Sequence, residues 1–190
     1  MQQSVPNSPS VFVVDDDLHF LDSLVVLLEA LGFSVHGFSS PRSFLKHYRP
    51  EMPGCLVLDI RMPRQSGLQL YEQLIRENKR IPVIFITAHA EVSTAVAAMK
   101  IGAVEFLEKP FDRETLLERV RKALALDAER RESDARYAAI DDRIAQLNDR
   151  ERETLSLIQA GESNKPLAPQ LQLTERAVEM RRSNIMRNLQ

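Results

Sequence analysis

The 190-residue chain has no tryptophan and a single cysteine, Cys55. One thiol cannot form an internal disulfide, so a disulfide-stapled fold is excluded. No apolar run approaches the roughly 20 residues that a membrane-spanning helix needs. The segment from Met1 to Ser10 also lacks the apolar core of a signal peptide. These absences predict a cytoplasmic protein with no membrane partner, in which Cys55 is a buried, unreactive thiol.

The chain also lacks an excess of charge of either sign, with a formal net charge of −2. A protein of this charge has no global attraction for nucleic acid, so any DNA-binding surface must be local. Apolar residues make up 44% of the sequence, which excludes a wholly disordered chain.

From Ser10 to about Ala125, short apolar runs alternate with segments of helical spacing. The strand-like runs are Val11–Val14, Phe33–Phe38, Cys55–Leu58, Val83–Ile86 and Val104–Leu107. The helical stripes are Leu21, Leu24, Val25 and Leu28; Leu68, Tyr71, Leu74 and Ile75; Val92, Val96 and Met99; and Leu116, Leu117, Val120 and Leu124. This alternation predicts an α/β domain, with a five-stranded parallel, doubly wound sheet of the flavodoxin-like type.

Polar residues able to do chemistry follow several of these strands. They are Asp15, Asp16, Asp59, Thr87 and Lys109. Ligands of such folds bind beyond the carboxyl ends of the strands, so we expect one cleft to hold all five.

Three carboxylates in one cleft repel each other, by about 4 kcal/mol per pair at 4 Å in an intermediate dielectric. Such a cluster either protonates or holds a divalent cation, and oxygen ligands favour Mg²⁺ or Mn²⁺ over zinc. Asp59 is then a candidate carboxylate nucleophile. The Lys109 ammonium and the Thr87 hydroxyl are suited to holding phosphoryl oxygens.

Four short motifs strengthen this interpretation. They are Asp15-Asp16, Asp59-Ile60-Arg61-Met62-Pro63, Thr87-Ala88-His89-Ala90 and Lys109-Pro110-Phe111. In their order and spacing, residues 10–125 resemble the receiver domain of response regulators. The resemblance implies a phosphorylation switch rather than an enzyme with an external substrate.

The resemblance assigns a role to each matching position. Asp59 would accept phosphate from a phosphohistidine on a sensor histidine kinase. Asp15 and Asp16 would hold Mg²⁺ (or Mn²⁺), together with Asp59 and the backbone carbonyl of Arg61. Arg61 and His89 also stand where the family tunes dephosphorylation.

The remaining roles concern the response to phosphate. Lys109 would bind the phosphoryl group, and the Lys109–Pro110 bond would be cis. Thr87 and Phe106 would form the switch pair, so that the surface of the fourth helix, fifth strand and fifth helix changes when Asp59 is phosphorylated. A phosphorylation-dependent homodimer is one expected result.

Residues 126–147 form a charged, alanine-rich segment without glycine or proline. Apolar positions recur at spacings of three and four, interrupted by Arg130 and Ser133, as in a coiled-coil seam with two polar defects. The charged pairs Asp127–Arg131 and Glu132–Arg136 favour helix. The sequence leaves open whether this helix is a solvated linker or a dimerising one.

A third pattern begins at Asn148, a predicted helix N-cap with Glu151 three residues further on. That helix is expected to stop at Gly161, and Ser163 and Thr174 are candidate caps for two more short helices. Three short helices joined by tight turns predict a helix-turn-helix unit.

The matching stretches are Asp149–Leu155, Gly161–Lys165, Ala177–Glu179 and Ile185–Leu189, and through them residues 148–190 resemble a LuxR-type DNA-binding domain. Joined to a receiver, this is similar to NarL/FixJ-type regulators. The resemblance implies contacts with duplex DNA, whose expected residues are Lys165, Arg176, Val178, Arg181, Arg182 and Arg187.

Some positions depart from that family. Pro166 and Pro169 replace helix formers, and Gln172 replaces a turn glycine, so an altered turn is expected. The family's fourth helix is missing after the third expected helix, which indicates either a truncated chain or a reduced output domain. Residues 148–190 hold seven basic and six acidic side chains, a weak basic footprint.

The expected organisation is therefore a disordered segment at 1–9, a receiver at 10–125, a helical linker at 126–147 and a helix-turn-helix domain at 148–190. The leading hypothesis is a two-component transcription regulator. The alternative is a phosphorylation-gated protein-interaction switch whose helix-turn-helix no longer binds DNA. A third candidate, a Mg²⁺-dependent phosphatase, lacks an evident substrate-recognition segment.

Overall fold

The computed structural model describes residues 8–88 and 92–189. The predicted disorder at 1–9 falls largely outside this range, as does His89. The chain divides into two compact units, Met1–Arg130 and Arg131–Gln190, and the division lies within helix α5.

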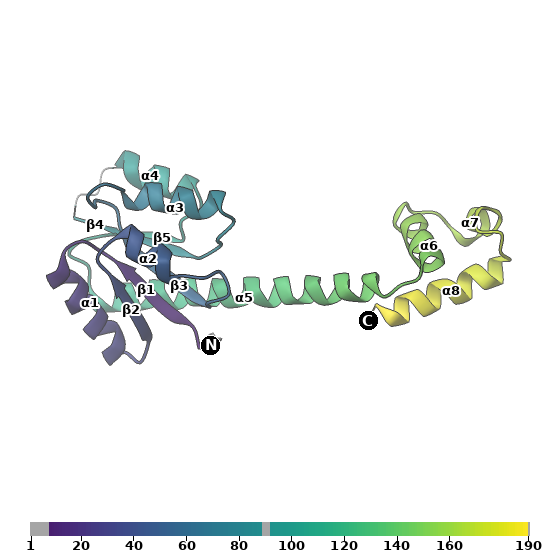
Figure 1. Cartoon of the computed structure of the whole chain (residues 1–190), viewed down its shortest axis with the longest axis horizontal. Coiled ribbons are helices and arrows are strands. Elements are labelled where there is room, and N and C mark those ends of the chain that lie inside the picture. Colours follow the sequence, from purple (N-terminus) through teal and green to yellow (C-terminus); the bar gives the residue numbers. More distant parts are fainter. Residues whose placement is uncertain (1–7, 89–91, 190) are drawn as a thin grey trace. The chain divides into compact units, whose positions relative to one another are not determined.

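The first unit alternates strands with helices (Figure 1). The strands are β1 (Ser10–Val14), β2 (Ser34–Phe38), β3 (Gly54–Asp59), β4 (Val83–Thr87) and β5 (Glu105–Glu108). The helices are α1 (Leu18–Ala30), α2 (Pro41–His47), α3 (Gly67–Arg76), α4 (Val92–Lys100) and α5 (Arg113–Ala145). The strands agree with the predicted runs to within a residue or two, whereas no apolar stripe indicated the short helix α2.

All strand pairs are parallel, and the strand order is β2-β1-β3-β4-β5. The order reverses between β1 and β3, where Val14 lies opposite Leu58. Since parallel strands end at the same edge, this switch point brings the residues that follow β1 and β3 together. The predicted doubly wound sheet is confirmed.

The core has a layer on each face of the sheet. One layer joins Val11, Val13, Cys55 and Val57 to the apolar faces of α1 and α5. The other joins Phe12, Val14, Leu56 and Leu58 to α2, α3 and α4. Strands β1, β3 and β4 are buried along their whole length, because helices cover both faces of the sheet. Cys55 lies in this core, and burial raises the pKa of its thiol.

Helix α4 does not turn its apolar stripe toward the sheet. Val92 is 80% exposed, and Val96 and Met99 are also exposed, whereas the small Ala98 is buried. Spacing shows that three residues share a side of a helix, but it does not show which side meets the sheet. The alanine side packs inward here and leaves a row of large apolar side chains on the surface.

The part of α5 within the first unit carries a buried charge that the sequence did not predict. Asp127 is 2% exposed, and it accepts a hydrogen bond from the backbone N–H of Gly54 at 2.9 Å. Arg130 pairs with Asp127 and donates to the carbonyl oxygen of Arg80. These contacts tie the middle of α5 to the amino-terminal edge of the sheet. Further along α5, the predicted pair of Glu132 and Arg136 is present.

The second unit contains the end of α5 and three short helices, α6 (Asp149–Gln159), α7 (Asn164–Gln170) and α8 (Glu175–Asn188). Asn148 and Glu151 form the predicted capping box, and Thr174 caps α8. Ser163 stands at the N-cap of α7, as predicted, but its side chain makes no capping hydrogen bond. The predicted side-chain cap was therefore wrong.

The core of the second unit is small, with Leu167, Ala168 and Val178 buried between α7 and α8. Pro169 lies inside the short helix α7. Gln172 has a φ of 55°, so the turn keeps a left-handed conformation although it lacks glycine. Over the described residues, no helix is both long and apolar enough to cross a membrane.

Candidate functional site

Lys109 lies at the centre of the candidate site, just beyond β5. Its Nζ atom lies 2.6 Å from Oδ2 of Asp15 and 2.8 Å from Oδ1 of Asp59. Asp15 follows β1 and Asp59 ends β3, the two strands at the switch point of the sheet. Three residues up to 94 positions apart thus meet, as the strand-end rule predicted. Their chemical roles stay predictions.

The second oxygen of each carboxylate is held by a backbone amide. Oδ1 of Asp15 accepts the N–H of Asp17 at 2.9 Å, and Oδ2 of Asp59 accepts the N–H of Arg61 at 2.7 Å. Every carboxylate oxygen of this pair therefore has a donor, which fixes the orientation of both groups. Lys109 also lies 3.9 Å above the ring of Phe20, a cation–π contact.

The electrostatics of the site favour a charged lysine between two acids. Burial raises the pKa of Asp59, although the hydrogen bond and charge of Lys109 act in the opposite direction. Burial would lower the pKa of Lys109, but the hydrogen bonds that Lys109 donates to Asp15 and Asp59 outweigh burial, together with the charges of the two carboxylates, and raise that pKa. Lys109 is thus a cation at neutral pH that bridges the two carboxylates.

Asp16 does not join this pair in the structure. Its side chain is exposed, while Asp15 and Asp59 are buried. Among the described residues, no three His, Cys, Asp or Glu side chains are grouped to hold a metal ion. The donor chemistry still fits Mg²⁺, because two buried carboxylates converge on one cation and Asp16 and the Arg61 carbonyl adjoin them in the chain.

The predicted switch pair lies on β4 and β5, the two strands that follow β3 in the sheet. Thr87, the last residue of β4, is buried, and Phe106 on β5 is half-buried opposite Phe85. The Lys109–Pro110 bond is cis, as expected. Arg61 has an exposed side chain.

The sequence did not predict the role of two residues that support the site. Asp17 caps α1 by accepting the N–H groups of His19 and Phe20, and its own N–H orients Asp15. An aspartate just before a helical stripe is a cap signal that could have found it. Gly67 was also missed, and a Cβ atom there would lie 2.2 Å from the carbonyl oxygen of Asp59. No sequence pattern shows that close approach.

In the structure, only some of the residues expected to contact DNA have exposed side chains. Lys165, Arg176 and Arg187 are exposed, and Arg181 is half-buried. Arg182 turns inward and donates to the Glu162 carbonyl at 3.3 Å and to Asn164 Oδ1 at 3.0 Å.

The position of Val178 contradicts the prediction that it contacts DNA. Its side chain is fully buried and packs in the core with Leu167 and Ala168. The small unit has few apolar groups for a core, so Val178 is used for packing and cannot reach a base edge without unfolding.

Comparisons with known proteins agree with both halves of the chain. Residues 11–121 match the family model described as a response regulator receiver domain. Residues 145–190 match the model described as bacterial regulatory proteins, luxR family.

Similar whole proteins are also known. The chain is 42% identical over 183 residues to the transcriptional regulatory protein FixJ of Azorhizobium caulinodans, covering 96% of this chain and 86% of FixJ. It is 38% identical to the response regulator protein TodT of Pseudomonas putida, covering 94% and 79%. The solved structure of the response regulator StyR matches with a TM-score of 0.81 and 44% identity, covering 96% of this chain and 92% of StyR.

Proposed function

Because the chain belongs to the response-regulator family, and joins a receiver domain to a LuxR-type helix-turn-helix domain, we propose that phosphorylation of Asp59 controls its binding to DNA. The protein is a two-component response regulator with a transcriptional output. The observation that carries the choice of Asp59 is the lysine bridge, in which Lys109 contacts both Asp59 and Asp15.

The proposed reaction transfers a phosphoryl group from a phosphohistidine of a sensor histidine kinase. An oxygen of Asp59 attacks phosphorus, the phosphorus–nitrogen bond breaks, and the imidazole leaves and takes up a proton. Lys109 then exchanges part of its contact with the carboxylates for a phosphoryl oxygen. Asp15, Asp16, Asp59 and the Arg61 carbonyl would hold Mg²⁺, or Mn²⁺, which neutralises charge on the phosphoryl oxygens.

The proposed switch runs through the next two strands. The Thr87 hydroxyl turns toward a phosphoryl oxygen, and Phe106 moves into the space that Thr87 vacates. The exposed row of Val92, Val96 and Met99 on α4 lies beside β5, so a change there alters an apolar surface. We propose that this surface forms a homodimer in the phosphorylated state, a shift of population between two conformations.

At the output end, we propose that exposed cations of the helix-turn-helix, Lys165, Arg176 and Arg187, contact phosphates or base edges of duplex DNA. The family match supports DNA binding over an interaction domain that has lost it. A DNA-binding regulator acts at the chromosome, so we propose a cytoplasmic location. No turnover of an external substrate is part of the proposed function.

The acceptor is tested by incubating the full chain with Mg²⁺ and acetyl phosphate and measuring the intact mass. We expect one added phosphoryl group in the wild type and in Asp22→Asn, a matched change at an exposed aspartate of α1. Asp59→Asn should stay unmodified. Phosphorylation that persists in Asp59→Asn would reject this acceptor.

The output is tested by selecting random duplex DNA with the chain activated by beryllofluoride and Mg²⁺. We expect a two-fold sequence to be enriched by the wild type and not by Asp59→Asn. Arg176→Ala should weaken binding and lower the salt dependence, while Arg121→Ala, on the exposed side of α5, should not. Equal enrichment with and without beryllofluoride would reject phosphorylation control.

A further inference from the structure

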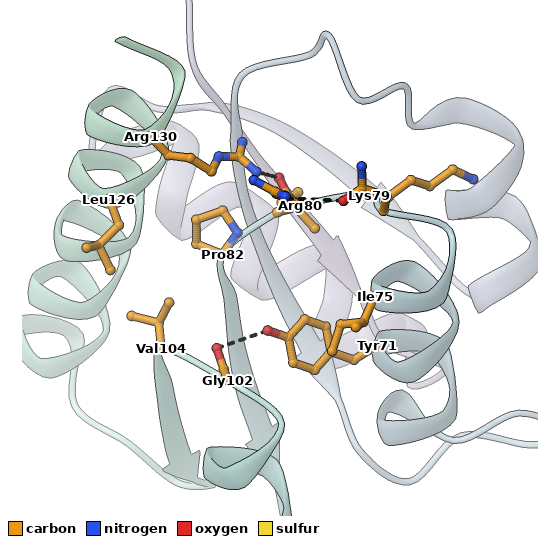
Figure 2. A pocket seen from close by; sticks show the side chains of 11 residues that line it. Tyr71, Ile75, Lys79, Arg80, Pro82, Gly102, Val104, Leu126 and Arg130 are labelled. Atoms are coloured by element: carbon orange, nitrogen blue, oxygen red, sulfur yellow. Dashed lines mark hydrogen bonds between the residues drawn. The ribbon is translucent and has the colours of Figure 1, made fainter. Parts of the chain in front are cut away.

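A pocket lies at the opposite end of the receiver strands from Asp59. It has a volume of about 330 Å³ and opens between α3 and α5, at the amino-terminal edge of β4 and β5 (Figure 2). Tyr71 and Ile75 form the α3 side, and Leu126 and Arg130 form the α5 side, with Pro82 between them. We refer to it as the α3–α5 pocket.

The body of the α3–α5 pocket is apolar. Ile81, Pro82 and Val104 are among its lining residues. The Tyr71 hydroxyl donates to the Gly102 carbonyl at 2.9 Å (Figure 2). Ile75 is 48% exposed and Leu126 is 41% exposed, so two large apolar side chains face water across the hollow. This volume and lining are those of a small-molecule site.

One end of the pocket is cationic. Lys79, Arg80 and Arg130 line it, and no aspartate or glutamate is among the described residues that do so. Lys79 is paired with Glu77, and Arg130 with Asp127, both outside the lining. The Arg80 side chain has only an amide partner among the described residues, Asn78 Oδ1 at 3.2 Å.

Arg130 has a fixed orientation at the cationic end of the pocket. Its guanidinium is held by Asp127 and by the carbonyl oxygen of Arg80, which Figure 2 shows beside it. Its Nε atom is buried, and in the described structure it has no hydrogen-bond partner. A guanidinium held in one orientation, next to the Arg80 charge that has no carboxylate partner among the described residues, suits a carboxylate.

We propose that the α3–α5 pocket binds a small amphipathic carboxylate. Its apolar body lies among Ile81, Pro82, Val104 and Leu126, and its carboxylate meets Arg80 and Arg130. Leu126 and Arg130 belong to α5, so the ligand strengthens the contact of this helix with the sheet. The site is separate in space from Asp59, at the opposite end of the strands.

The test uses the full chain with isotope-labelled Ile, Leu and Val methyl groups and three probes of matched shape. The probes are 4-phenylbutyrate, 4-phenylbutan-1-ol and 4-phenylbutylamine. We expect 4-phenylbutyrate to give saturable NMR shifts at the methyl groups of Ile75, Ile81, Val104 and Leu126. It should bind about five-fold more tightly than the alcohol, with the amine weakest.

Three variants locate the site. Leu126→Trp and Ile75→Trp fill the hollow from opposite walls, and either should abolish the shifts while beryllofluoride still activates the protein. Arg80→Gln should leave the affinity for the alcohol unchanged and lower the affinity for 4-phenylbutyrate. The matched change Arg121→Gln, on the exposed side of α5, should leave it unaltered.

Two results would overturn the proposal. The first is the absence of saturable shifts at these methyl groups with probe on the order of 10 mM, the weak limit of a specific site. The second is equal binding of the acid and the alcohol in the wild type, which would remove the role of Arg80 and Arg130. Because Asp59→Asn should bind 4-phenylbutyrate like the wild type, failure of the phosphorylation scheme is distinguishable from failure of this site.

Discussion

Replacing Asp127 with alanine tests how α5 is attached to the sheet. The Asp127 carboxylate is buried and accepts the N–H of Gly54, the first residue of β3, from 73 positions away in the chain. Alanine leaves that buried N–H without its acceptor and Arg130 without its carboxylate. The site has little room to adapt, because a Cβ atom at Gly54 would lie 2.0 Å from the Ser10 carbonyl oxygen.

The cost follows from the hydrogen bond. A bond to a charged group contributes about 1.5–3 kcal/mol, and alanine regains roughly 0.5 kcal/mol through its higher helix propensity. Asp127→Ala should therefore lower the free energy of unfolding of the first unit by about 2 kcal/mol, or the melting temperature by roughly 6–10 °C. Asp127→Asn keeps an acceptor for Gly54 and should cost less.

Tyrosine near-UV circular dichroism is a suitable assay, since Tyr48 and Tyr71 are buried in the first unit and Tyr137 is exposed in the second. The matched control is Asp134→Ala at an exposed position of α5, which should change stability by less than about 0.5 kcal/mol. If Asp127→Ala melts with the control, the bond to Gly54 is not formed in solution and the reasoning fails.

Three further predictions concern the turn, the acceptor strand and the acceptor itself. Gln172→Gly should stabilise the second unit by about 1 kcal/mol, because glycine adopts a positive φ without the steric cost that an L side chain carries. Gln159→Gly, in the ordinary helix α6, should destabilise it in the same thermal melt; a Gln172→Gly melt at or below wild type would contradict the strain argument. Gly67→Ala should displace the Asp59 backbone. It should therefore destabilise the first unit and slow phosphorylation by acetyl phosphate. The control is Gly37→Ala, where the added Cβ meets only movable side-chain atoms and the effect should be small. Burial raises the pKa of Asp59, so its ionised form opposes folding above the ordinary aspartate pKa of about 4. Asp59→Asn should therefore raise the melting temperature at pH 7, and this gain should disappear as the pH falls below about 4. A lower melting temperature of Asp59→Asn at pH 7 would show that the ionised carboxylate stabilises the fold.

Much of the fold was predictable because local patterns and one topological rule sufficed. Buried parallel strands are continuous apolar runs, so β1, β3 and β4 were visible in the sequence. The rule that ligands bind at the carboxyl ends of strands then grouped Asp15, Asp59 and Lys109 from their positions in the chain alone.

The remaining features depend on contacts between distant residues. The packing of α7 decides whether Val178 faces the core or a groove of DNA. Packing at Ala98 decides which side of α4 faces the sheet. The burial of Asp127 depends on Gly54, and the missing cap at Ser163 depends on side-chain geometry. Periodicity and spacing carry no information about such partners.

The position of Cys55 has a practical consequence. It is the only cysteine of the chain, it is fully buried in β3, and burial raises the pKa of its thiol. A thiol reagent in excess can therefore modify the native protein only when the central strand opens. Because β3 also ends in Asp59, the labelling rate with and without beryllofluoride measures how far a mimic of phosphate on Asp59, at one end of the strand, slows opening of the strand at Cys55.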